Sequence, residues 1–193
     1  IIGIIIAAVM SGKGIISSGE NKLFYQTFAG KWHTVLSSYY DRMGANLADS
    51  NVDGYFDGVD VDESIVTLLK TSGVDPCKII SSNEKLGTKC HPGKYTVEGE
   101  FGSSTVTVNL SAYKIADETT INNYLVFKNI PSDVAMAIDK YIDSITNSKE
   151  GNCLILGETA TFEADNLDAI TPLGYSELST KGVAVNLGVQ LEH

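Results

Sequence analysis

The sequence is short of positive charge and of cysteine, and each shortage narrows the classes of protein that fit it. Among 193 residues there are 14 Lys and Arg against 24 Asp and Glu, so the formal net charge is -10 at pH 7. Such a chain repels phosphates, and no run of basic residues offsets the repulsion, so nucleic acid is not expected as a partner. Three cysteines do not suggest a small disulfide-dense scaffold. The length is enough to bury a hydrophobic core without such cross-links.

Motifs of common enzymes are also missing. The sequence has no G-x-S-x-G, no H-E-x-x-H, no P-loop, and no G-x-G-x-x-G after a predicted strand. Its three histidines are His33, His91 and His193, and His33 lies beside Trp32 in a predicted helix. Carboxylate pairs arise by chance among 24 acidic residues. We therefore expect no enzymatic activity.

The apolar start of the sequence is too short to cross a membrane by itself. The segment IIGIIIAAVM, from Ile1 to Met10, would extend about 15 Å as a helix, half the thickness of a hydrocarbon core. It lacks the basic region and the cleavage pattern of a signal peptide. We interpret it as part of a longer apolar helix that was cut. The alternative is a short helix buried in the core.

A second helical pattern follows this segment. Apolar side chains recur every three or four residues, as on one face of a helix: Phe24, Phe28, Trp32, Val35, Leu36, Tyr39 and Met43. Gly and Ser, which are poor helix formers, separate the two patterns. A long helix is therefore predicted over residues 1–44, with a distortion near Gly12 to Gly19.

After residue 94 the apolar period becomes two, which is typical of strands. The segments TVTVNL, TINNYLVFKNIP, GNCLILGETATFEA and GVAVNLGVQ predict strands, and Gly102–Ser104 is expected to form a hairpin turn. Shorter helices are predicted at Glu63–Thr71 and after the N-cap residue Ser132. The predicted fold class is α+β: a long N-terminal helix packed on an antiparallel sheet, with an additional short helix in the C-terminal half.

The segment DSNVDGYFDGVD, between the long helix and the sheet, has the spacing of a calcium loop. Oxygen ligands of an EF-hand-type loop fall at positions 1, 3, 5, 7, 9 and 12, which here are Asp49, Asn51, Asp53, the Tyr55 carbonyl, Asp57 and Asp60. Gly54 occupies position 6, where the loop turns sharply. The final Asp in place of Glu resembles the dockerin variant of the loop. One calcium ion would brace the loop, whereas the alternative is a solvated acidic turn.

The cysteines predict one disulfide. Cys77 and Cys90 bracket a polar loop, and in an exported protein such a pair favours a bridge. Metal binding by Cys90 with His91 is the rival interpretation, but the spacing matches no zinc pattern. Cys153 would then be a buried thiol, although three cysteines allow three pairings.

The stretch IIGIIIAAVMSGKGI resembles the second half of the hydrophobic helix of type IV pilins and type II secretion pseudopilins. An amphipathic half-helix follows it, as Phe24 to Met43 would here. The family's N-methylated first residue and the Glu at the fifth mature position are missing. The resemblance implies an N-terminal region of residues 1–44 and a globular region of residues 45–190. Residues 191–193 are interpreted as a tag remnant.

The resemblance further implies a filament subunit, and the size and the extra helix favour a minor or specialised pilin. Its partners would be other pilin subunits, contacted through the N-terminal helix. The protein would lie in the bacterial inner membrane before assembly and in a periplasmic or extracellular filament afterwards. The alternatives are a pseudopilin of a type II secretion system and a membrane-anchored, exported binding module stabilised by calcium.

Overall fold

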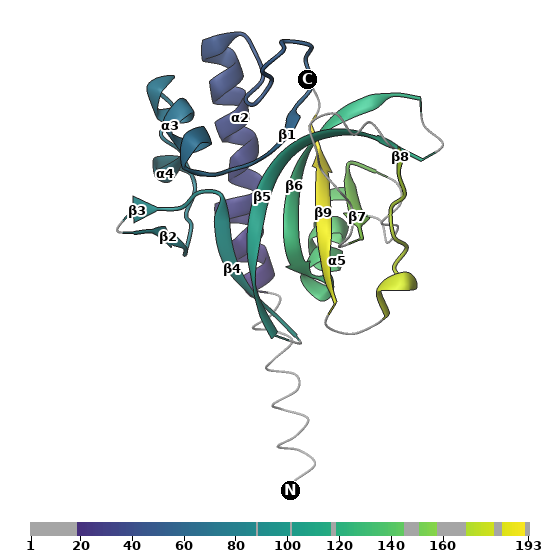
Figure 1. Cartoon of the computed structure of the whole chain (residues 1–193). Coiled ribbons are helices and arrows are strands. Elements are labelled where there is room, and N and C mark those ends of the chain that lie inside the picture. The colour runs from purple at the N-terminus through teal and green to yellow at the C-terminus, as the bar shows by residue number, and fades with distance from the viewer. Residues whose placement is uncertain are drawn as a thin grey trace, which may run out of the picture.

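The computed structural model has a mixed α+β architecture (Figure 1). It describes residues 19–87, 89–100, 102–116, 119–144, 151–157, 169–179 and 183–191. A long helix and the shorter helix α5 (Ser132–Asp143) pack on a curved, mainly antiparallel sheet. The predicted combination of helices with an antiparallel sheet is therefore present.

The long helix runs from residue 19 to residue 43. Residues 19–24 are α-helical, η1 (Tyr25–Ala29) is a π-helical turn, and α2 (Gly30–Met43) completes the helix. In the π turn the Gly30 N–H donates to the Tyr25 carbonyl, and a Cβ on Gly30 would lie 3.1 Å from that oxygen. Gly44 ends the helix in the left-handed conformation, at φ +68°. The remainder of the predicted helix, residues 1–18, lies outside the described residues.

The apolar stripe of the long helix is buried. Its six buried members are Phe24, Phe28, Trp32, Val35, Leu36 and Tyr39, and they belong to one core with the sheet. The rings of Phe24 and Phe28 lie 6.0 and 6.2 Å from the Phe127 ring on the sheet. The Trp32 Nε1–H donates to the Pro92 carbonyl at 3.1 Å. The stripe stops at Tyr39, because Met43 in the last turn is half exposed.

The main sheet has the order β1-β5-β6-β9-β7, and β4 and β8 also pair with β5. Its strands are β1 (Asp57–Asp60), β4 (Lys94–Gly99), β5 (Gly102–Ile115), β6 (Ile121–Pro131), β7 (Cys153–Leu156), β8 (Ala169–Ile170) and β9 (Ala184–Gln190). The β5–β8 pair is parallel, and the other pairs are antiparallel. The Gly102–Ser104 hairpin turn was wrongly placed, because Gly99 pairs with Gly102 and the turn comes before β5.

A smaller unit is formed by the part of the chain between β1 and β4 in the sequence. It comprises α3 (Glu63–Thr71), α4 (Pro76–Ile79) and the hairpin of β2 (Lys85–Leu86) and β3 (Lys89–Cys90). Asp62 begins α3, since its side chain accepts hydrogen bonds from the Ser64 and Ile65 N–H groups. A short 3-10 helix, η2 (Glu177–Ser179), follows β8 later in the chain.

Both faces of the sheet carry buried side chains. Alternate residues of β5, β6 and β7 point into the core under the helices, and the residues between them form a second cluster: Tyr113, Ile115, Tyr124, Val126, Leu154 and Leu156. In this cluster the Tyr113 and Tyr124 rings stack at 3.9 Å. Gly188 is required beside them, because a Cβ there would lie 2.1 Å from the Tyr113 hydroxyl.

The fold extends through Leu191. This residue, interpreted from the sequence as part of a tag remnant, is buried, and its N–H donates to the Asn123 carbonyl at 2.9 Å. Glu192 and His193 lie outside the described residues. Across the described ranges, no helix has both the length and the apolar character needed to cross a bilayer.

Candidate functional site

The acidic loop from Asp49 to Asp60 connects the long helix to β1. Both carboxylate oxygens of Asp49 accept backbone hydrogen bonds, from the Asp53 N–H at 3.1 Å and the Gly54 N–H at 3.0 Å. Gly54 has φ +92°, so the sharp turn expected at loop position 6 is present. The two hydrogen bonds to the Asp49 carboxylate therefore hold the first half of the loop in a turn around this side chain.

Asn51 and Asp53 lie next to Asp49 in this turn. The Asn51 Nδ2 donates to Asp53 Oδ2 at 2.9 Å, and Asp53 Oδ1 accepts the Tyr55 N–H at 2.9 Å. Between them Val52 takes φ +59°, a conformation that is uncommon for a β-branched residue. Three predicted ligand residues, Asp49, Asn51 and Asp53, are thus brought together.

The loop is attached to the sheet by Asn123 on β6. Its Nδ2 donates to the Gly54 carbonyl at 2.8 Å, and its Oδ1 accepts the Phe56 N–H at 2.9 Å. The buried Phe56 ring anchors the same segment in the core. No sequence motif indicated Asn123, which lies 67 residues from Phe56.

The two remaining carboxylates have other partners. Asp57 Oδ2 accepts the Ser50 N–H at 2.8 Å, which joins the end of the loop to its beginning. Asp60 accepts from Asn109 Nδ2 at 2.9 Å and from Lys128 Nζ at 3.1 Å, both on the sheet. The structure thus pairs Asp60 with Lys128 and not with the ligands at the loop tip. In the described part of the chain, no three His, Cys, Asp or Glu side chains are placed to hold a metal ion.

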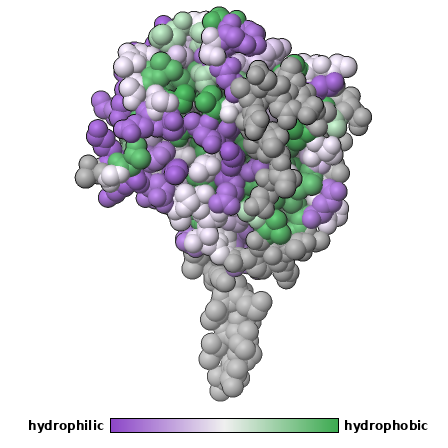
Figure 2. All heavy atoms as spheres, viewed as in Figure 1, coloured by the Kyte–Doolittle hydropathy of each residue, from purple (hydrophilic) through white to green (hydrophobic). Residues whose placement is uncertain are grey.

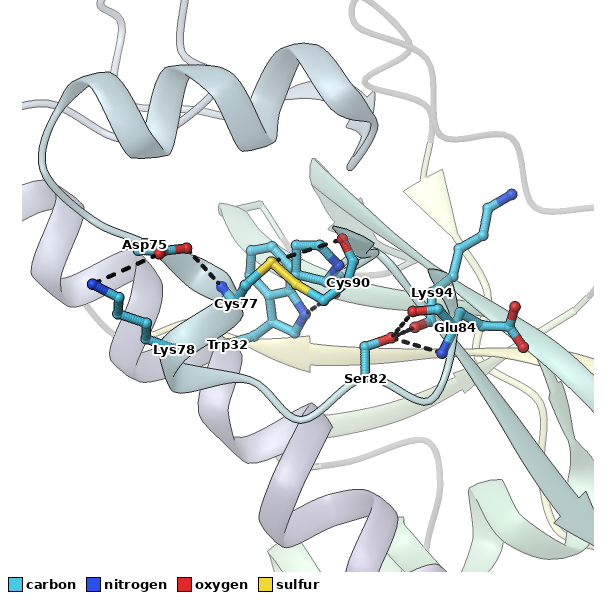
Figure 3. The surroundings of a disulfide bond; sticks show 9 residues. Trp32, Asp75, Cys77, Lys78, Ser82, Glu84, Cys90 and Lys94 are labelled. Atoms are coloured by element: carbon cyan, nitrogen blue, oxygen red, sulfur yellow. Dashed lines mark hydrogen bonds and ion pairs between the residues drawn. A yellow bond between two sulfur atoms is a disulfide. The ribbon is translucent and has the colours of Figure 1, made fainter. Parts of the chain in front are cut away.

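Cys77 and Cys90 form a disulfide that links α4 to the β2–β3 hairpin (Figure 3). Their Cα atoms lie 6.0 Å apart, within the usual range. Asp75 caps α4 by accepting the Cys77 N–H at 3.2 Å. Trp32 lies beside the bridge, so the disulfide sits against the long helix. Cys153 is free and buried, as expected from the sequence.

A buried polar cluster on α5, which no sequence motif indicated, contains Asp139 and Asp143. Asp139 on α5 is fully buried, and it accepts a hydrogen bond from the Tyr175 hydroxyl. On the same helix, Asp143 accepts the Asn152 and Cys153 N–H groups at 3.1 and 3.0 Å. Burial raises the pKa of Asp139 to about 6. These contacts fix the start of β7 and the Tyr175 segment on α5.

Comparison with the models of known families, with curated proteins and with solved structures found no match to this chain.

Proposed function

We propose that the protein is a structural subunit of a type IV pilin-like filament. The observation that supports this most is the helix of residues 19–43, which buries one apolar face on an antiparallel sheet and follows the apolar segment Ile1–Met10 in the sequence. In a filament, many copies of such apolar segments pack together. Their packing buries apolar surface that a single copy would expose to water.

In this proposal the apolar helix is the assembly element and the sheet domain forms the outer surface. The subunit would lie in the bacterial inner membrane before assembly and in a periplasmic or extracellular filament after assembly. A minor or specialised pilin fits the size of the globular part. A type II secretion pseudopilin would use the same helix, so it remains the alternative within the same family.

The natural gene upstream of the Ile1 codon tests the family assignment. We expect it to encode a short leader, then Phe, with Glu at the fifth mature position. A gene that places the start codon directly before Ile1 would contradict the proposal.

Filament assembly tests the role of the helix. In the complete gene product, Ile5→Glu should abolish the filaments seen by electron microscopy, because it places a charge in the packed helices. Lys22→Glu, on the exposed side of the described helix, is the control and should still assemble. Immunoblots establish that both variants accumulate, and filaments of undiminished number from Ile5→Glu would refute the proposal.

A calcium ion in the acidic loop is the second part of this proposal. Its support is the arrangement of Asp49, Asn51 and Asp53 around the turn at Gly54. Asp57 and the Tyr55 carbonyl complete the proposed ligand set. Asp60 would join only by giving up Lys128, so the site is proposed without it.

A further inference from the structure

A pocket of about 290 Å³ lies beside the disulfide, between α3 and the segment that carries β2 and β3. Val66, Leu86 and Pro92 supply its apolar lining. Lys70 and Lys89 supply positive charge, and Glu63 supplies one negative charge. Its volume falls just below the range of about 300–1,000 Å³ that is common for small-molecule sites. The pocket therefore suits one or two inserted side chains better than a cofactor.

The surroundings of the pocket have the opposite charge to the rest of the chain. Residues 62–94 hold five lysines against four carboxylates, Asp62, Glu63, Asp75 and Glu84, a formal charge of +1 in a protein of net charge -10. Figure 2 shows hydrophilic side chains gathered on the β2–β3 side of the molecule, around a small apolar patch.

Lys70 and Lys89 carry the positive charge of the pocket itself. Both are exposed, and within the described ranges neither forms an ion pair with a carboxylate. His91, which also lines the pocket, is buried, and burial together with nearby Lys94 lowers its pKa. Burial thus favours the uncharged form of the histidine, and Lys70 and Lys89 outnumber Glu63 among the charged groups that line the pocket.

The acidic loop carries a tip that matches this pocket. Val52 is 75% exposed, and backbone hydrogen bonds to Asp49 and Asp53 hold it at the outside of the turn. Asp49, Asp53 and Asp57 are neighbours of Val52 in the sequence, so the loop that carries this apolar side chain is acidic. Because Asn123 fixes the loop to β6, little conformational entropy would be lost when the tip is bound.

We propose that the Val52 tip of one copy docks in the pocket of a second copy, with its aspartates facing Lys70 and Lys89. The inference rests on the proposed function for the nature of the partner. Tip and pocket are different surfaces of the chain, so the contact is heterologous, and in a filament it repeats from copy to copy. Such a contact would join the outer domains of neighbouring subunits along a filament.

Cysteine cross-linking between two batches of protein tests the contact. Val52→Cys, labelled with ¹⁵N, is mixed with unlabelled Leu86→Cys at about 0.15 M salt, where long-range repulsion between the acidic copies is screened. A chelator keeps calcium out of the comparison. Oxidation should give a mixed cross-link, measured by mass spectrometry of the labelled and unlabelled peptides.

Leu68→Cys provides the matched control. Leu68 and Leu86 are equally exposed, at 40%, but only Leu86 lines the pocket. We expect at least tenfold more cross-link from Leu86→Cys than from Leu68→Cys. Equal yields from the two variants, or no cross-link from either, would overturn the proposal.

Charge reversal distinguishes the effect of the pocket lysines on the cross-link yield from the effect of the protein's net charge. Lys70→Glu with Lys89→Glu, added to the Leu86→Cys partner, should lower the yield at least fivefold. Lys31→Glu with Lys140→Glu changes the net charge equally at exposed positions outside the pocket and should leave the yield unchanged. If both pairs lower the yield equally, the pocket is not the docking site. Failure here would leave the helix-driven filament standing, because the Ile5→Glu experiment tests that independently.

Discussion

Among the carboxyl groups of the described residues, Asp139 is the one whose ionisation is most strongly opposed by its surroundings. The side chain is fully buried, and burial is the main cause that raises its pKa to about 6. Asp143 on the next turn of α5 raises it further, whereas the hydrogen bonds from Tyr175 and Cys153 lower it. Ionisation of Asp139 therefore places a negative charge in the buried space between α5, β7 and the Tyr175 segment.

This predicts that Asp139 makes the protein less stable as the pH rises. The folded pKa lies above the unfolded value of 3.8, so the folded state holds the proton more tightly. The resulting stability is present below about pH 4 and is lost as the pH passes through about 6. The loss amounts to at most about 3 kcal/mol, from a shift of about two units.

Asp139→Asn isolates this effect, because it keeps an acceptor for the Tyr175 hydroxyl and cannot ionise. In urea unfolding, the difference in free energy of unfolding between variant and wild type should shift in favour of the variant between pH 4 and pH 8. Asp133→Asn, on the first turn of the same helix, controls for general charge effects. A difference between Asp139→Asn and wild type that does not vary with pH would contradict the assignment.

At the scale of elements, the loop between α2 and β1 is already ordered by its own side chains. Asp49 and Asp53 accept four backbone or side-chain hydrogen bonds within the loop. A calcium ion would use the carboxylate oxygens that now receive these bonds, so binding and local rigidity are coupled.

Calcium binding to this loop predicts a heat signal and a stabilisation. Calorimetry at millimolar calcium should show one site, and a hundredfold excess over Kd should stabilise the fold by about 2.7 kcal/mol. Asp53→Ala should abolish both effects. Asp60→Ala should keep calcium uptake, since this carboxylate faces Lys128 on the sheet. No uptake by the wild type would mean that the loop is an acidic turn only.

At the scale of the whole molecule, the disulfide links α4 covalently to the β2–β3 hairpin, and the linked segment packs beside the long helix. Only thirteen positions separate Cys77 from Cys90, yet the bridged segment rests on Trp32 and contributes the pocket wall. Opening the bridge frees this segment in the unfolded state more than in the folded one.

Reduction should therefore lower the free energy of unfolding by about 3 kcal/mol. Trp32 is the single tryptophan and reports the transition by fluorescence in denaturant. The double variant Cys77→Ala/Cys90→Ala should match the reduced protein and be insensitive to reductant. Thiol titration of the unfolded, unreduced protein should find one thiol, from Cys153. Three thiols would refute the bridge in solution.

Local patterns are sufficient to predict most helices and strands here. The spacing of Phe24, Phe28 and Trp32, the alternation along β5 and the N-cap at Asp62 are properties of neighbouring residues, and the backbone geometry of each element imposes them. The π turn was missed, because one extra residue in a helical turn alters the spacing of apolar side chains very little. The hairpin turn was placed at Gly102–Ser104 because Gly and Ser are typical turn residues, although these residues belong to β5.

The partners of individual polar side chains were decided by the tertiary structure alone. Asp60 meets Lys128 across 68 positions, and Tyr175 meets Asp139 across 36, while Lys70 and Lys89 share a pocket only because α3 packs beside the hairpin. Sequence spacing specifies which face of an element a side chain occupies. It does not specify which distant element will cover that face, because strand register and helix packing depend on the whole core.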